Sequence, residues 1–271
     1  MNIAAARGRP HGSALVRALA TERAYFELAA QVRLLPGATL AWMPAHAGSP
    51  AGAVIHRVDA ATVAGLGTAW VIAALQALAD AGAGLARIYC DGPDLAVDSL
   101  LRAAGFSSRR ELVFVASLAD IDSDLALVAV ASEKDWARKR ALHAAADASP
   151  DGHARSADDW VAIERAKCAK GMDCFLAERD GAAVGAVSAV WGEGMLRFKN
   201  LDVHPAFRRT VVASTLLARL AAYGRDRGYG QQCALALAGE AGEMLYRTLG
   251  MTEAGSQIEW SRPLAGQESA A

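Results

Sequence analysis

The sequence lacks the residue patterns that bind structural metals or form a disulfide framework. Its four cysteines, Cys90, Cys168, Cys174 and Cys233, are widely spaced, and no Cys-x-x-Cys pair or histidine cluster lies near them. Structural zinc sites need closely spaced cysteine and histidine ligands. We therefore expect reduced, buried thiols and no bound metal.

The chain also lacks an excess of charge of one sign and an apolar leader. Its formal net charge is −1, whereas nucleic-acid-binding domains usually carry a strong basic patch. At the N-terminus, Arg7 and Arg9 are followed by Arg17, Glu22 and Arg23, which interrupt any apolar core of a signal peptide. These absences predict a cytoplasmic protein that binds no nucleic acid.

One stretch, residues 60–79, has no charged side chain and is long enough to be considered as a membrane-spanning helix. Gly65 and Gly67 lie near its start, and Asp59 and Asp80 bound it. These residues favour a buried helix of a water-soluble protein, so we expect no membrane contact.

What the chain does have is a composition that suits one large or two small globular domains. It is 53% hydrophobic and 21% charged over 271 residues. Apolar periodicity and glycine or proline punctuation predict alternating helices and strands. The expected helices cover residues 12–31, 68–81, 94–104, 132–145, 157–170, 212–228 and 240–249, and the expected strands cover residues 38–43, 52–58, 86–90, 111–117, 125–131, 174–178, 183–191, 196–203, 232–238 and 257–261.

The two halves of the chain share one order of parts: helix, turn, strand, short helix, glycine with an apolar residue, and final strand. Gly105 and Gly250 close the two short helices, and the spacing from Gly67 to Gly105 matches that from Ala213 to Gly250 within one residue. This self-similarity predicts an internal duplication with a boundary between residues 118 and 119. The alternative is that the halves are two unrelated α/β segments whose turn residues lie at matching positions by chance.

The stretch Leu196–Ser214 predicts a strand, a turn and the start of a helix. Its apolar run stops at His204-Pro205, because proline cannot donate to a strand ladder. Arg208 and Arg209 then precede the helix. Cationic side chains beside the unpaired N–H groups of a helix start suit a phosphorylated ligand; the alternative is a solvated arginine pair.

Residues 125–261 resemble the GNAT superfamily of acetyl-CoA-dependent N-acyltransferases. In that family a strand is followed by Arg or Gln, two variable residues, Gly, one variable residue, and Gly or Ala. Arg208, Val211 and Ala213 stand at these positions. A later tyrosine lies four residues before a glycine, and Tyr246 and Gly250 match it. Val211 replaces a glycine that would let the backbone approach a pyrophosphate closely.

The resemblance implies an α/β (α+β) fold with two GNAT-like mixed β-sheet domains flanked by helices. Residues 1–118 would form a degenerate GNAT-like domain, because Thr62 and Leu101 replace the family's arginine and tyrosine there. Residues 119–271 would form a GNAT acetyltransferase domain, with acetyl-CoA between two splayed central strands. The implied protein is a monomer or homodimer whose partners are acetyl-CoA and an amine acceptor, a small molecule or a peptide.

The resemblance also assigns residues. Tyr246 is implied as the acid that protonates the departing thiolate, and Val203 as the residue whose backbone aligns the thioester. The implied acetyl-CoA-binding residues are Leu201, Asp202, Val203, Arg208, Arg209, Thr210, Val211, Val212, Ala213 and Ser214. The general base stays open among Asp202, His204, Glu178 and Glu193.

Two alternatives to this enzyme remain open. Val211 and the replaced residues of the first half would suit a non-catalytic acyl-CoA-binding or scaffolding protein of GNAT fold. The turn from Gly65 to Gly67 could instead hold the cofactor, because it keeps the glycine spacing that the second half has lost.

Overall fold

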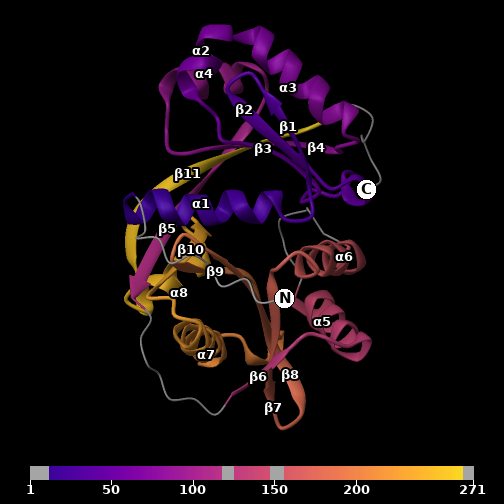
Figure 1. Ribbon diagram of the computed structural model, residues 1–271, viewed down its shortest axis with the longest axis vertical. Helices are drawn as coiled ribbons and strands as arrows, with labels where there is room; N and C mark the ends of the chain where they lie inside the picture. Colours follow the sequence, from indigo (N-terminus) through magenta and orange to yellow (C-terminus); the bar gives the residue numbers. More distant parts are fainter. Residues whose placement is uncertain (1–11, 118–124, 147–155, 265–271) are drawn as a thin grey trace.

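The computed structural model describes residues 12–117, 125–146 and 156–264 of the chain. The strands form one mixed sheet of eleven strands, with helices on both faces (Figure 1). The strands are β1 (Gln31–Leu35), β2 (Ala38–Trp42), β3 (Ala53–His56), β4 (Leu85–Cys90), β5 (Ser107–Ser117), β6 (Ala126–Ala129), β7 (Asp173–Arg179), β8 (Ala182–Gly192), β9 (Met195–Val203), β10 (Gln231–Leu237) and β11 (Thr252–Pro263). The helices are α1 (Ala14–Glu27), α2 (Ala60–Leu66), α3 (Thr68–Asp80), α4 (Leu95–Ala103), α5 (Glu133–Ala146), α6 (Ala157–Cys168), α7 (Val212–Asp226) and α8 (Ala241–Thr248), with 3-10 turns η1 (Pro44–His46) and η2 (Pro205–Phe207).

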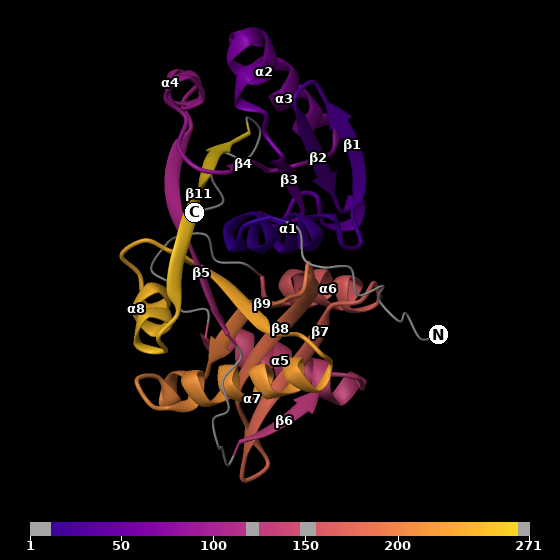
Figure 2. The same ribbon diagram turned by 60° about the vertical axis from the view of Figure 1, so that its left-hand side comes forward.

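The order of strands in the sheet is β1-β2-β3-β4-β11-β5-β10-β9-β8-β7-β6. The last strand of the chain, β11, lies between β4 and β5, and β5 lies between β11 and β10. Figures 1 and 2 show β5 and β11 running side by side from one half of the molecule into the other. The resemblance implied two mixed β-sheet domains, whereas the described strands form one continuous sheet.

The length of β5 and β11 explains this difference. They contain 11 and 12 residues, whereas the sequence predicted shorter strands at 111–117 and 257–261. Most of the added residues are polar, and Gly255 lies at a register shift opposite β5; such residues have weak strand propensity. The first residues of β5 are a strand because they pair with β11, and the first residues of β11 because they pair with β5. This pairing satisfies backbone N–H and C=O groups on that side.

The edge strand β1 was not predicted. The expected helix over residues 12–31 ends earlier, with α1 stopping at Glu27, and β1 then forms a hairpin with β2 around Pro36-Gly37. The side chains of β1 are mostly exposed. It therefore lacks the alternation of apolar and polar residues that marks a half-buried strand.

The uncharged stretch of the first half is two helices. α2 and α3 meet at Gly67, whose φ of 56° ends the first helix, and their axes differ by 105°. Across the described residues, no single helix is both long and apolar enough to cross a membrane, although this bent pair meets the length and composition criteria when taken together.

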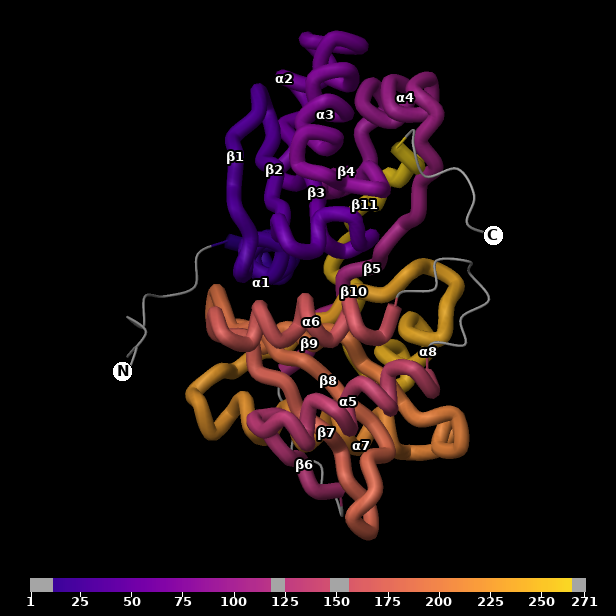
Figure 3. The backbone as a smooth tube through the Cα atoms, turned by 90° about the vertical axis from the view of Figure 1, so that its right-hand side faces the viewer, coloured from indigo at the N-terminus to yellow at the C-terminus, as the bar shows by residue number. Residues whose placement is uncertain are grey.

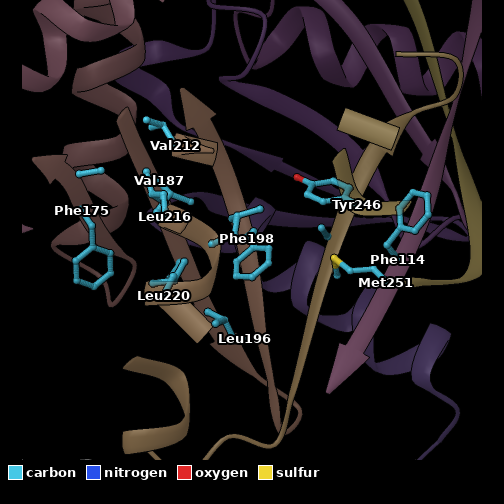
Figure 4. Close-up of a cluster of buried hydrophobic side chains, with 14 of the residues drawn as sticks. Phe114, Phe175, Val187, Leu196, Phe198, Val212, Leu216, Leu220, Tyr246 and Met251 are labelled. Carbon is cyan, nitrogen blue, oxygen red and sulfur yellow. The ribbon is translucent and has the colours of Figure 1, made fainter. Parts of the chain in front are cut away.

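Helices cover both faces of the sheet in the second half. On one face α7 packs on β8 and β9 through Val212, Leu216 and Leu220, which recur at four-residue intervals (Figure 4). On the other face α5 packs Leu142 against Leu176 of β7. Figure 3 shows α5 and α6 in front of these strands. In this half the sheet is therefore a middle layer between helices.

β9 and β10 are the strands that separate. They pair in parallel only between Met195–Arg197 and Gln231–Cys233, after which β10 follows β5 and β9 follows β8. The register of β8 against β9 shifts in this region, and Asn200 of β9 has a φ of 52°. Such a bulge bends its strand, so β9 turns away from β10.

Trp260 of β11 links the C-terminus to the core of the first half. Its side chain is 0% exposed and lies in a cluster with residues of α3, α4 and β4. We expect Trp260→Ala to lower the free energy of unfolding by about 3–5 kcal/mol, because it leaves a large cavity. Urea unfolding followed by circular dichroism measures this change.

The control is Leu95→Ala, since Leu95 is 86% exposed and exposed substitutions usually change stability by less than about 0.5 kcal/mol. Equal stability of the two variants would show that β11 does not contribute to the core of the first half.

Candidate functional site

A cavity of about 940 Å³ opens where β9 and β10 separate. Its walls come from β9, from the turn between β9 and α7, from the first residues of α7, and from α8. This volume lies within the range of small-molecule and cofactor sites. We call it the donor cavity.

The donor cavity brings together most of the residues expected from the sequence. The side chains or backbone of Leu201, Asp202, Val203, Arg208, Arg209, Thr210, Val211, Ala213, Ser214 and Tyr246 line it. The exception is Val212, which is 0% exposed and packs in the core beneath α7.

The start of α7 presents unpaired backbone donors to this cavity. The N-cap residue Val211 makes no side-chain cap, and the first turn carries no acidic residue, although Thr210 Oγ1 accepts the N–H of Val212 at 3.4 Å. The Thr215 N–H is bonded to the Val211 carbonyl, while the N–H groups of Ala213 and Ser214 have no acceptor among the described residues. The helix dipole adds partial positive charge at this end. An anion is therefore the natural ligand of this turn.

Val211 is compatible with this arrangement. Its φ of −72° is an ordinary helical value, so the position does not need the conformational freedom of glycine. Its side chain is 64% exposed. The residue with positive φ in this turn is Arg209, at 61°.

The two arginines of the turn differ in their contacts. Arg208 donates a hydrogen bond to the carbonyl of Ala146 at the end of α5. Arg209 has no hydrogen-bond or ion-pair partner within the described part of the chain and lines the cavity. It is thus available for a ligand without breaking a protein contact.

Tyr246 of α8 is 7% exposed, and its ring centroid lies 5.7 Å from that of Phe114. Figure 4 shows its hydroxyl pointing away from Phe114, toward the side where Phe198 lies. Burial raises the pKa of Tyr246, and the nearby charge of Arg197 opposes this only in part. The phenol therefore holds its proton at neutral pH and can donate it to a leaving group.

Of the four candidate bases from the sequence, Asp202 lines the donor cavity, with its Oδ2 atom 3.1 Å from Nδ1 of His143. Glu178 of β7 forms an ion pair with Arg138 of α5 at 2.5 Å. Glu193 lies in the turn between β8 and β9, and His204 accepts the N–H of a residue in its own turn.

A second, smaller cavity of about 290 Å³ adjoins the first. Its walls come from both halves of the chain, namely from α1, β2, β4 and β5 and from α6, β9 and β11. Glu111, Lys199 and Asn200 line both cavities. We call this one the inner chamber, and these three residues form its boundary with the donor cavity.

Glu111 is the acidic residue on this shared boundary, and the sequence did not identify it. It lies on β5 and accepts a hydrogen bond from Gln257 of β11. Burial raises its pKa, the carboxylates of Glu22 and Glu259 add to the effect, and Lys199 opposes it. The only signal in the sequence is a charged residue at the start of an apolar run, which also marks an ordinary strand end.

Glu22 of α1 is a buried carboxylate that is bonded to Lys199 on the boundary of the two cavities. It binds Arg197 at 2.5 Å and Lys199 at 2.9 Å. Burial alone would raise its pKa, but the two cations lower it to about 2. Glu22 is therefore always ionised and fixes both cations of β9 in place.

The comparisons with known proteins agree with this geometry. The sequence model described as acetyltransferase (GNAT) family matches residues 134–251. The match spans 118 of the 271 residues and lies within the second half of the chain, which is therefore similar to that family. No curated protein matches the sequence.

Several solved structures share the fold. A functionally unknown conserved protein from Staphylococcus epidermidis has a TM-score of 0.66 at 11% identity, covering 88% of this chain and 95% of its own. A GCN5-related N-acetyltransferase from Kribbella flavida has a TM-score of 0.62 at 14% identity, covering 93% and 97%. A tandem GNAT protein from the clavulanic acid biosynthesis pathway has a TM-score of 0.54 at 14% identity, covering 85% and 79%. The GNAT fold therefore extends beyond the residues that match in sequence.

Lys167 of α6, in the wall of the inner chamber, makes the stability of this GNAT fold depend on pH. Burial and the charge of Lys199 lower its pKa from 10.5 to about 7. Between these values the unfolded chain binds more protons than the folded one, so this group makes stability rise with pH. Between the two pKa values, the free energy of unfolding falls by about 1.4 kcal/mol for each pH unit by which the pH is lowered.

We expect Lys167→Met to remove this contribution. The variant should gain stability over the parent as the pH falls from about 10 to about 7. Urea unfolding of both proteins across this range measures the difference, and parallel stability curves would contradict the expectation.

Proposed function

We propose that this protein is an acetyl-CoA-dependent N-acetyltransferase that transfers acetyl directly to an amine. The observation that carries the proposal is the donor cavity, which places an uncapped helix start, two arginines and a protonated tyrosine around one opening in the sheet. The match of residues 134–251 to the GNAT family supports acyl-CoA as the donor.

In this proposal the turn and the first residues of α7 bind the pyrophosphate. The N–H groups of Ala213 and Ser214 bond phosphate oxygens, and Arg208 and Arg209 add charge-assisted contacts. The backbone of Leu201–Val203 has β8 on one side and the donor cavity on the other. It is therefore free to hydrogen-bond the pantetheine arm, and Val203 aligns the thioester.

The proposed reaction is a single displacement. The amine nitrogen attacks the thioester carbon, the carbon–sulfur bond breaks, and the products are an amide and CoA. Glu111 removes the proton of the attacking amine, because it lies where the two cavities meet. Tyr246 gives its proton to the departing thiolate.

We further propose that the chain is a tandem of two GNAT-like halves, the first degenerate, that exchange strands at the centre of the sheet. Outward from β11 and β5 the order is β4-β3-β2-β1 on one side and β10-β9-β8-β7 on the other. Each side has one parallel junction, β3 with β4 and β9 with β10. The boundary at residues 118 and 119 lies outside the described residues. The first half shapes the acceptor site.

A titration of acetyl-CoA by calorimetry tests the donor site. We expect Arg209→Ala to weaken binding roughly tenfold, since a contact to a charged group contributes more than about 1.4 kcal/mol. Ala213→Trp should abolish binding, because it fills the cavity beside the helix start.

The matched controls are Arg33→Ala on the exposed strand β1 and Gly65→Trp, where a side chain meets open space. Gly65→Trp also tests whether the first half holds the cofactor. A parent protein that does not bind acetyl-CoA, or a loss of binding in Gly65→Trp alone, would reject the donor site.

Kinetics separate an enzyme from a protein that only binds acyl-CoA. With the best acceptor from a panel of primary amines, we expect Glu111→Gln to lower kcat/KM by about 10²–10⁴-fold and to remove the acidic limb of its pH profile. Tyr246→Phe should lower kcat with little change in the dissociation constant of acetyl-CoA. Binding of acetyl-CoA without turnover of any amine would favour the non-catalytic alternative.

A further inference from the structure

We propose that the inner chamber selects a small amine that carries a carboxylate and an apolar or aromatic group, and that Lys167 and Lys199 bind the carboxylate. This inference rests on the proposed function, and it names the acceptor class of the same site. It follows from three features of the chamber: a pair of ammonium groups, an imbalance of buried charge, and aromatic walls.

The two ammonium groups flank the same ring. Nζ of Lys167 lies 4.2 Å from the ring centroid of Tyr25, and Nζ of Lys199 lies 4.5 Å from it. Both side chains line the chamber. Two like charges beside one cavity repel each other, and an anion placed between them removes that repulsion.

Lys167 has no carboxylate partner within the described part of the chain. Its Nζ donates to the carbonyl oxygens of Tyr25 at 2.5 Å and Leu28 at 3.1 Å, and its side chain is 3% exposed. Its lowered pKa agrees with a cation that is buried without a counter-ion. The site is therefore built to accept an anion from outside the chain.

The neighbouring cations, Arg197 and Lys199, are both bonded to the same single carboxylate. Glu22 serves both Arg197 and Lys199, and Nε and Nη1 of Arg197 are buried with no hydrogen-bond partner among the described residues. Glu22 is the carboxylate bonded to these two cations, Glu111 also acts on both, and Lys167 lies close enough to act on the same group, so three cationic side chains face two carboxylates. This end of the chamber carries net positive charge.

The other charged groups around the chamber are already paired. Glu259 of β11 accepts two hydrogen bonds from Arg87 of β4, at 3.0 and 2.9 Å. Arg109 pairs with Glu240, and behind Asn200 the Glu164 carboxylate pairs with Lys139 at 3.0 Å. These paired groups neither neutralise Lys167 and Lys199 nor compete with them for the carboxylate of the ligand.

Glu111 is the exception, because it lies on the boundary with the donor cavity and forms no ion pair among the described residues. An acceptor whose amine faces Glu111 has its nitrogen beside the thioester. Its carboxylate then faces the lysines. The chamber therefore presents a carboxylate to the amine end of one molecule and ammonium groups to its carboxylate end.

The walls and the volume define the rest of the acceptor. Phe26, Trp42, Tyr89 and Trp160 line the chamber, and the rings of Phe26 and Tyr89 lie 4.7 Å apart. About 290 Å³ holds a molecule of the size of an amino acid, with an apolar side chain against these rings. A polyamine is disfavoured because it would add positive charge beside two lysines.

The test compares matched compounds that differ only in the carboxylate: L-phenylalanine against 2-phenylethylamine, and L-leucine against 3-methylbutylamine. Calorimetric titration into the protein saturated with CoA measures binding, and acetylation is followed with acetyl-CoA. We expect each carboxylate-bearing compound to bind at least about tenfold more tightly than its partner.

The decisive variant is Lys167→Met, with Lys170→Met as control because Lys170 is exposed near the end of the same helix. Lys167→Met should remove the preference for the carboxylate, so that L-phenylalanine and 2-phenylethylamine bind with similar affinity. Lys170→Met should keep the preference. A merely structural role of Lys167 would change the binding of both compounds equally.

The inference is overturned if neither carboxylate-bearing compound binds, if the paired compounds bind equally, or if Lys167→Met retains the preference. Acetyl-CoA titration without an acceptor separates these results from failure of the proposed function. A protein that binds acetyl-CoA and acetylates the amines without a carboxylate keeps the function and loses this acceptor class.

Discussion

The pairing of β5 with β11 is the constraint on which the rest of this structure depends. The two strands come from positions far apart in the chain, and together they join β4 to β10 in one sheet. Trp260 of β11 is consequently buried in the core of the first half, while Phe114 of β5 lies in the core of the second. Neither half can complete its own sheet from its own sequence.

The same pairing builds the inner chamber. Glu111 comes from β5 and Glu259 from β11, so the two carboxylates in its wall lie on these two paired strands. Their neighbours across the chamber belong to α1 and α6, which come from different halves. The inner chamber is therefore an interface within one chain, whereas the donor cavity lies mainly in the second half. Under the proposed function, such a division allows the acceptor wall to vary without disturbing the turn that binds the donor.

The residues that line the donor cavity could be grouped from the sequence because their signals are local. A proline ends β9, an arginine pair follows, and the apolar positions of α7 recur at helical spacing; Leu201 to Ala213 then need only one strand and one helix to be brought together. The acceptor side was not predicted, because Glu111, Lys167 and Lys199 are far apart in the chain. Their meeting depends on long-range strand order, which no periodicity encodes. The full length of β5 and β11 was missed for the same reason.

Val211 shows how a sequence motif and the geometry behind it can differ. A glycine is needed where φ is positive or where a side chain would block the ligand. Here the positive φ lies at Arg209, and the Val211 side chain is largely exposed. The N–H groups that face the donor cavity belong to Ala213 and Ser214, which have no acceptor among the described residues. Anion binding at this turn requires free N–H groups at a helix start beside a separated strand pair. Several sequences can satisfy that requirement.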